Sequence, residues 1–177
     1  MKTIKQFGIV LTMALATLLT SCSGSDDGGG GGGSASLGQL KAKVGGSNFT
    51  SMNLATFATK QVIGTTTTII IQGSDASGKA IQLILNGTNG AAGTFEISDT
   101  ANISAIASYS EVNINNPMAS QTWAAPYDSS GAVGSITISE ITDTNVKGTF
   151  NFTGKNQNGT DTKAITNGAF NINFTTN

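Results

Sequence analysis

The side chains that most often perform catalysis are scarce in this chain of 177 residues. It has no His and a single Cys, Cys22, whereas Asp and Glu together number ten. The lack of His excludes a Ser-His-Asp triad, a Cys-His pair and an imidazole metal ligand. One Cys excludes an intrachain disulfide bond and a zinc site built from several cysteines. The enzyme class that we weigh is therefore one that uses carboxylates alone.

The carboxylates do not form a recognisable catalytic pair. Those in the body of the chain are Asp75, Glu96, Asp99, Glu111, Asp128, Glu140, Asp143 and Asp161. Their spacing selects no two residues as the acid and base of glycoside hydrolysis. The segment Asn156 to Asp161 lacks a calcium-loop pattern and predicts a hairpin turn instead. We therefore expect a protein that is not an enzyme, with no catalytic residue, metal or cofactor, and we keep a carboxylate-only enzyme as the least favoured alternative.

One segment could contact a ligand by aromatic stacking. Trp123 is the only Trp, and Tyr127 follows four residues later. Because sugars stack on aromatic faces, these two residues are the candidate glycan contacts. The competing interpretation is that Trp123 fills the core, as large aromatic side chains usually do. Since the chain has few aromatic residues, we expect Trp123 to be buried.

The N-terminal segment is typical of a secretion signal. Two Lys residues precede an apolar stretch from Gly8 to Leu19, which is too short for a membrane-spanning helix and suits a signal-peptide core. The sequence Leu19-Thr20-Ser21-Cys22 comes next and resembles a bacterial lipobox. That resemblance implies a signal peptide over residues 1–21, cleavage before Cys22 and acylation of its thiol. Each buried CH2 of an acyl chain adds about 0.8 kcal/mol, so two or three chains would hold the protein in a membrane.

A low-complexity linker separates Cys22 from the body of the chain. Residues 22–36 are rich in Gly, Ser and Asp, and a run of six Gly cannot bury a side chain, so we expect a flexible tether. Two interpretations of its acidic part stay open, a solvated linker or a surface-sorting signal. The second follows from a resemblance to lipoproteins of the Bacteroidetes, which carry a Ser/Asp-rich stretch after the lipidated Cys. The candidate sorting residues are Ser23, Ser25, Asp26 and Asp27.

The charge of the chain limits its partners. It has nine Lys, no Arg and a net charge of -1. Nucleic acid requires a basic surface, so we exclude it as a partner. Removal of the two Lys of the signal peptide makes the net charge more negative. Attachment to an anionic membrane would therefore depend on the acyl groups.

Residues 37–177 predict one all-β domain. Apolar residues alternate there with Thr, Asn and Ser, in the sets Ile81, Leu83 and Leu85; Ile136 and Ile138; Phe150 and Phe152; and Phe170, Ile172 and Phe174. Because side chains alternate along a strand, each set gives one buried face. The expected strands span 39–45, 54–60, 66–72, 80–86, 94–97, 103–110, 120–125, 134–141, 146–153 and 162–174, the last with a break near Asn167-Gly168. We expect a single antiparallel β-sandwich or partly closed barrel of roughly 8–10 strands in a meander, with at most a short helix.

Three Gly-x-Phe triplets recur at unequal spacings. They are Gly93-Thr94-Phe95, Gly148-Thr149-Phe150 and Gly168-Ala169-Phe170. Unequal spacing argues against a solenoid repeat. We interpret the triplets as strand starts, where Gly permits a bend and Phe enters the core.

The second half of the chain resembles a known family. The matching segments are Gly134-Ser135-Ile136-Thr137-Ile138, Asp143, Gly148-Thr149-Phe150-Asn151-Phe152 and Ile165-Thr166-Asn167-Gly168-Ala169-Phe170-Asn171, with weaker matches at Val44 to Phe49 and Gly93 to Phe95. Together they are similar to a domain-of-unknown-function family of short secreted lipoproteins from Bacteroidetes. The resemblance implies a β-sandwich and a lipid anchor, and it implies no activity.

These observations predict a non-catalytic lipoprotein of the outer membrane, anchored through Cys22 and facing the periplasm or the cell surface. We expect an accessory or binding subunit of an envelope protein complex. The alternative is a small glycan-binding module. An exposed apolar patch would favour the first function, and an exposed aromatic shelf with Asn and Asp around it would favour the second.

Overall fold

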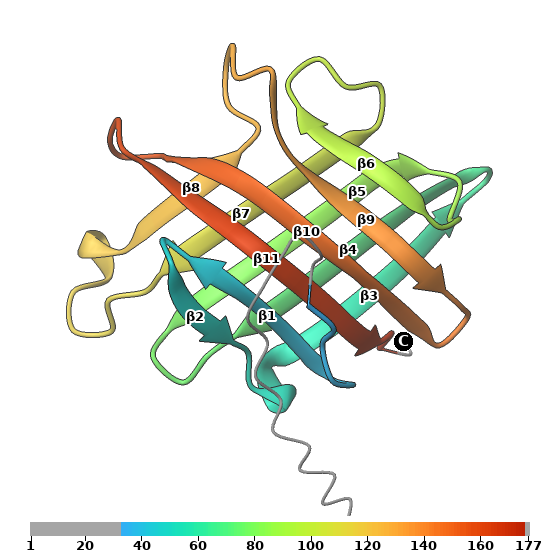
Figure 1. Cartoon of the computed structure of the whole chain (residues 1–177), viewed down its shortest axis with the longest axis horizontal. Coiled ribbons are helices and arrows are strands. Elements are labelled where there is room, and N and C mark those ends of the chain that lie inside the picture. The colour runs from blue at the N-terminus through green and yellow to red at the C-terminus, as the bar shows by residue number, and fades with distance from the viewer. Residues whose placement is uncertain (1–32, 176–177) are drawn as a thin grey trace, which may run out of the picture. The chain divides into compact units, whose positions relative to one another are not determined.

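The computed structural model describes residues 33–175, and within this range the chain is almost entirely β-structure (Figure 1). The strands are β1 (Gln39–Val44), β2 (Ser47–Thr50), β3 (Thr56–Ile63), β4 (Thr66–Ser74), β5 (Lys79–Thr88), β6 (Gly93–Ser98), β7 (Ser104–Glu111), β8 (Gln121–Ala125), β9 (Ala132–Ile141), β10 (Asn145–Asn156) and β11 (Thr162–Asn173). Two 3-10 turns, Asn53–Ala55 and Pro117–Ala119, are the helical elements of the described chain. The all-β prediction is confirmed. The predicted signal peptide, Cys22 and the sorting residues lie outside the described residues.

All the strands belong to one 11-stranded sheet, whose main path runs β2-β1-β11-β10-β8-β7-β5-β4-β3. The pairings between these strands are antiparallel. The sheet forks at β10. Residues Val146–Phe152 of β10 pair with β9, whereas Lys155 and Asn156 pair with β8. β6 extends the β9 branch.

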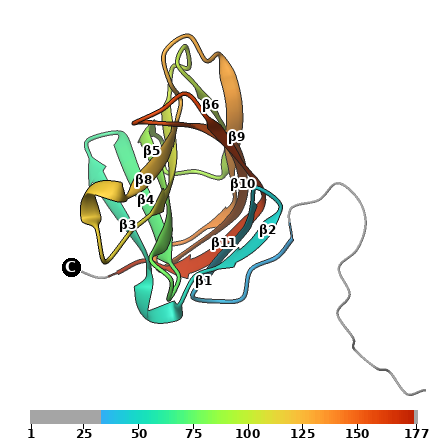
Figure 2. The same cartoon turned by 90° about the vertical axis from the view of Figure 1, so that its left-hand side faces the viewer.

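The sheet curls into two facing layers (Figure 2). One layer contains β3, β4, β5, β7 and β8, and the other contains β1, β2, β6, β9, β10 and β11. The end of the chain returns to the first layer, because Phe174 forms a parallel bridge with Ala58 of β3 and the Thr175 amide donates to the Ala58 carbonyl at 2.8 Å. The domain is therefore a curled single sheet that closes in part, as predicted.

The core lies between the two layers and follows the predicted alternation. Ile81, Leu83 and Leu85 of β5 are buried, and Gln82 and Ile84 between them face outward. The other predicted sets are also buried, at Ile136, Ile138, Phe150, Phe152, Phe170 and Ile172. Phe174 is partly buried and packs against the same cluster.

Two of the three Gly-x-Phe triplets do not start a strand, which corrects the prediction. Gly93 begins β6, but Gly148 lies inside β10 and Gly168 lies inside β11. Glycine inside a strand usually marks a close approach of another group. Here the group is an aromatic ring from the neighbouring strand.

Gly148 and Phe150 of β10 pack reciprocally with Gly168 and Phe170 of β11. Gly148 pairs with Phe170, and Phe150 pairs with Gly168. A Cβ on Gly168 would lie 2.5 Å from the carbonyl oxygen of Phe150 and 2.7 Å from its ring. A Cβ on Gly148 would clash with the Phe170 ring and with the carbonyl oxygen of Thr137. Because glycine has no side chain, each phenylalanine ring can lie over the glycine opposite it on the partner strand. The centroids of the Phe150 and Phe170 rings lie 6.4 Å apart.

The strand prediction differs from the structure at four points. β2 was not expected, and β3 starts at Thr56 because the 3-10 turn Asn53–Ala55 precedes it. The break expected near Asn167 is a bulge within a continuous strand, where the β10–β11 register shifts and Asn167 has a φ of 51°. The order is also not a simple meander, since β6 pairs with β9 instead of a sequential neighbour. Within residues 33–175, no helix combines the length and hydrophobicity needed to cross a bilayer.

Candidate functional site

Trp123 is buried in the middle of β8. It is 5% exposed, so its predicted burial is confirmed. Its indole Nε1 donates a hydrogen bond of 2.7 Å to Oδ2 of Asp161, and its ring lies 5.8 Å from the ring of Tyr109. The Lys163 ammonium lies 3.5 Å from its ring centroid. Trp123 therefore has no free face on which a sugar could stack.

Tyr127 has different surroundings from Trp123. It is half-buried beyond the end of β8, and the Lys155 ammonium lies 5.7 Å from its ring centroid. Trp123 instead packs against Tyr109 and Lys163. The glycan-binding alternative depended on an exposed aromatic shelf, and the buried Trp123 does not supply one.

A charged network covers the buried side chains of Tyr109 and Trp123. Glu111 Oε1 accepts a hydrogen bond of 2.7 Å from the Lys163 ammonium and one of 2.9 Å from the Tyr109 hydroxyl. Strand alternation places these groups together. Glu111 follows the buried Tyr109 by two residues, and Lys163 precedes the buried Ile165 by two. Both charged side chains therefore point to the inner side, where the core meets water.

The pKa shifts of Glu111 and Tyr109 keep the charge states of both groups unchanged near neutral pH. Burial raises the pKa of the Glu111 carboxyl, but hydrogen bonds from Lys163 and Tyr109, together with nearby positive charge, outweigh it and hold that pKa below 4.5. Burial, and then the hydrogen bond and charge of Glu111, raise the pKa of the Tyr109 hydroxyl well above 10.0. Glu111 is therefore ionised and Tyr109 protonated at pH 7. Neither group is tuned for proton transfer at that pH.

The β10–β11 hairpin extends this network. The Asn156 side-chain amide donates at 2.9 Å both to Asp161 Oδ1 and to Gln121 Oε1. The backbone amide of Asn156 donates to the carbonyl oxygen of Asp161 at 2.9 Å, which confirms the predicted turn. The hydrogen bond from Trp123, aided by Asn156, holds the pKa of Asp161 below its usual value. Sequence analysis did not connect these residues, because 38 positions separate Trp123 from Asp161.

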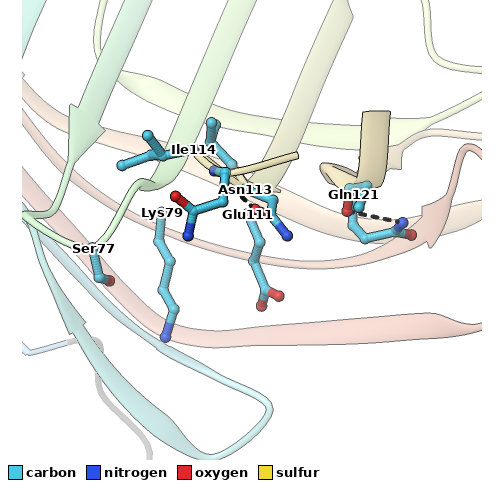
Figure 3. A pocket seen from close by; sticks show the side chains of 9 residues that line it. Ser77, Lys79, Glu111, Asn113, Ile114 and Gln121 are labelled. Atoms are coloured by element: carbon cyan, nitrogen blue, oxygen red, sulfur yellow. Dashed lines mark hydrogen bonds between the residues drawn. The ribbon is translucent and has the colours of Figure 1, made fainter. Parts of the chain in front are cut away.

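An open depression of about 420 Å³ lies beside the network (Figure 3). Its lining residues are Ser77, Lys79, Glu111, Val112, Asn113, Ile114, Asn115, Ala119 and Gln121. Lys79 and Glu111 are cross-strand partners, and Glu111 is already paired with Lys163. The lining contains one carboxylate, so it does not supply the acid and base of glycoside hydrolysis. Within residues 33–175, no cluster of three or more acidic side chains could hold a metal ion.

A second surface is distinguished by its lack of charge. It is the outer side of the layer β3-β4-β5-β7-β8, here called the uncharged face. Strand alternation and register place four rows of side chains there: Ser74, Ala80, Ser110 and Thr122; Phe57, Gln72, Gln82, Ser108 and Ala124; Thr59, Ile70, Ile84 and Ile106; and Gln61, Thr68, Asn86 and Ser104. None of them is ionisable.

Polar side chains on the uncharged face form hydrogen bonds with one another. Gln82 donates to Gln72 at 3.0 Å, Thr68 donates to Asn86 at 2.8 Å, and the Ser110 and Thr122 hydroxyls are 3.0 Å apart. The row that contains Ile106, 40% exposed, gives the face an apolar centre. The strand sequences carried a usable signal for this face, because their alternate positions lack charge.

The outer side of the other layer differs. Alternation places Lys41, Lys43, Glu96, Lys147 and Lys155 there, and the register shift between β9 and β10 adds Glu140. Lys155 is the cross-strand partner of Ala124, so it borders the uncharged face at the β8 edge. Lys147 pairs across strands with Glu140. The two broad sheet surfaces of the domain are therefore unequal in charge.

Comparison with known proteins identifies a family for the whole folded domain. No curated protein and no solved structure shows significant similarity to the chain. A family model described as a domain of unknown function, DUF6252, matches residues 39–172. The match starts with β1 and ends one residue before the end of β11. The chain therefore belongs to the DUF6252 family, and the matched residues include the reciprocally packed glycines and phenylalanines of β10 and β11.

Proposed function

We propose that this protein is a non-catalytic lipoprotein, held in the outer membrane by acyl groups on Cys22, whose folded domain is a binding subunit of an envelope protein complex. The anchor is supported by the position of the only Cys at the end of a lipobox. The resemblance to secreted lipoproteins of Bacteroidetes supports the same cellular location. The binding role is supported by the uncharged face.

The uncharged face is the single observation that carries the binding role. Protein surfaces exposed to water usually carry interspersed charges, whereas the centre of a protein interface is depleted of them. On this face the apolar residues Ile70, Ile84 and Ile106 form a central row, with amide and hydroxyl groups on both sides. That arrangement matches a contact surface with an apolar centre and a polar surround.

The anchor is tested by Cys22→Ala in the native host. The wild-type chain should incorporate labelled fatty acid and sediment with membranes after a high-salt wash. Cys22→Ala should lose both properties, because the acyl chains would supply the membrane affinity. A variant that keeps both would show that the lipobox interpretation is wrong. The double change of Asp26 and Asp27 to Asn tests sorting separately, by protease accessibility on whole cells.

The binding role is tested by a charge on the uncharged face. We expect in-cell crosslinking of the tagged full chain to give a discrete product that Ile84→Lys abolishes, because a buried unpaired ammonium is costly. The matched control is Asn151→Lys, which adds the same charge to the outer side of the other layer. Equal products from both variants would refute the role of this face.

A further inference from the structure

We propose that the uncharged face binds the same face of a second copy, so that two chains stack sheet against sheet about a two-fold axis. The inference rests on the binding role proposed above and identifies the partner of that surface. It is carried by the charge distribution, by the area of the face and by the place of Ile84 at its centre.

Charge restricts what can cover this face. A charged partner surface would lose water and gain no counter-charge here, which is costly. The partner must therefore be uncharged over the contact area. The outer side of the other layer is unsuitable, since it carries Lys41, Lys43, Lys147, Lys155, Glu96 and Glu140. The uncharged face can meet its own copy without repulsion, as an interface with two-fold symmetry requires.

The size of the face is sufficient for a specific dimer. It spans five strands and four side-chain rows. With strands about 4.8 Å apart and rows about 6.8 Å apart, its area is about 600 Å² per chain. Stacking would bury about 1,200 Å² in total, which is the lower end of the range for specific interfaces. No strand of the described chain packs on this side of the layer (Figure 2).

The geometry points to Ile84 as the centre of the contact. β5 is the middle strand of the five, and Ile84 lies between Ile70 of β4 and Ile106 of β7. A two-fold axis that runs along β5 keeps each side-chain row opposite itself and therefore places Ile84 against Ile84 of the second copy. The apolar row would then be covered by its own counterpart, at the spacing of about 10 Å between stacked sheets.

Single-cysteine crosslinking of the full chain in intact cells tests this arrangement. The variants are Ile84→Cys and Ser108→Cys on the uncharged face, treated with a short membrane-permeant bismaleimide. Ser108→Cys is almost isosteric, so it reports on the face even if Ile84→Cys folds poorly. We expect both to give a product of twice the chain mass. The matched control, Asn151→Cys on the outer side of the other layer, should give none.

A Lys introduced on the uncharged face tests whether the lack of charge there is what permits the dimer. Combining Ser108→Cys with Ile84→Lys should lower the dimer yield at least about ten-fold, whereas combining it with Asn151→Lys should leave the yield unchanged. A dimer product from Asn151→Cys, or no product from both face variants, would overturn the proposal.

Two other crosslinking results would distinguish failure of the dimer from failure of the function proposed above. A crosslink from the uncharged face to a different protein would overturn the dimer and leave the binding role standing. A product from the wild-type chain, whose only thiol is Cys22, would refute lipidation of that thiol instead.

Discussion

Replacing Trp123 by Ala removes the largest side chain of the core where the core meets the charged network. The indole is 5% exposed and contacts the ring of Tyr109, so its loss leaves a cavity beneath Lys163. Large-to-small changes of this kind cost about 3–5 kcal/mol of unfolding free energy. In a domain of this size, about 1 kcal/mol lowers the melting temperature by roughly 3 °C. We therefore expect Trp123→Ala to melt about 10–15 °C below the wild type.

Thermal unfolding followed by far-ultraviolet circular dichroism measures this effect without using Trp fluorescence. Trp123→Phe should recover more than half of the loss, because it keeps a buried ring, although it gives up the hydrogen bond to Asp161 and part of the ring that contacts Lys163. The aromatic control is Tyr127→Ala, which removes a half-buried ring and should cost less than half as much. A Trp123→Ala protein that melts within about 2 °C of the wild type would refute the assignment of Trp123 to the core.

Two further predictions concern backbone packing and acid stability. Gly168→Ala should destabilise the domain by at least about 3 kcal/mol in urea unfolding, because its Cβ would lie 2.5 Å from the carbonyl oxygen of Phe150. Gly45→Ala, with a φ of +54° and open space around it, should cost only about 1 kcal/mol, so equal losses would contradict the close-packing explanation. The pKa of Glu111 in the folded protein lies below 4.5, so its contribution is present above that pH and is lost as the pH falls further. Melting temperatures measured across the acid range should therefore fall less steeply for Glu111→Gln than for the wild type, and identical slopes would rule out this contribution.

Strand positions were predictable wherever apolar residues alternate over several positions. Ile81, Leu83 and Leu85 illustrate this, because one buried face against a polar one determines both the strand and its orientation. β2 escaped prediction because it has four residues and only Phe49 is buried, which is too little for a periodic pattern. The interior glycines were misassigned for a different reason. Each of these glycines makes room for a phenylalanine ring on the neighbouring strand, and the local sequence does not show which strands are neighbours.

The candidate site was less predictable than the fold. Lys163, Glu111 and Asp161 meet around Trp123 only because the curled sheet brings β7, β8 and β11 to one end of the core. The sequence identified Trp123 as buried from the scarcity of aromatic residues, but it could not name these partners. The uncharged face was not predicted, because it depends on the strand order and on which alternate positions of β3, β5 and β7 point outward, away from Lys60, Lys79 and Glu111.

The pairing of β1 with β11 has a consequence for how the chain acquires its fold. Gln39 and Asn171 are partners in adjacent strands although about 130 residues separate them. A ribosome completes β11 last, so β1 can pair only with the short strand β2 until almost the whole chain has been made. Contacts between such distant segments also slow folding, because a long loop must close before they form. Closure of the sheet should therefore wait until synthesis is almost complete, and that delay is compatible with passage across a membrane before the sheet closes.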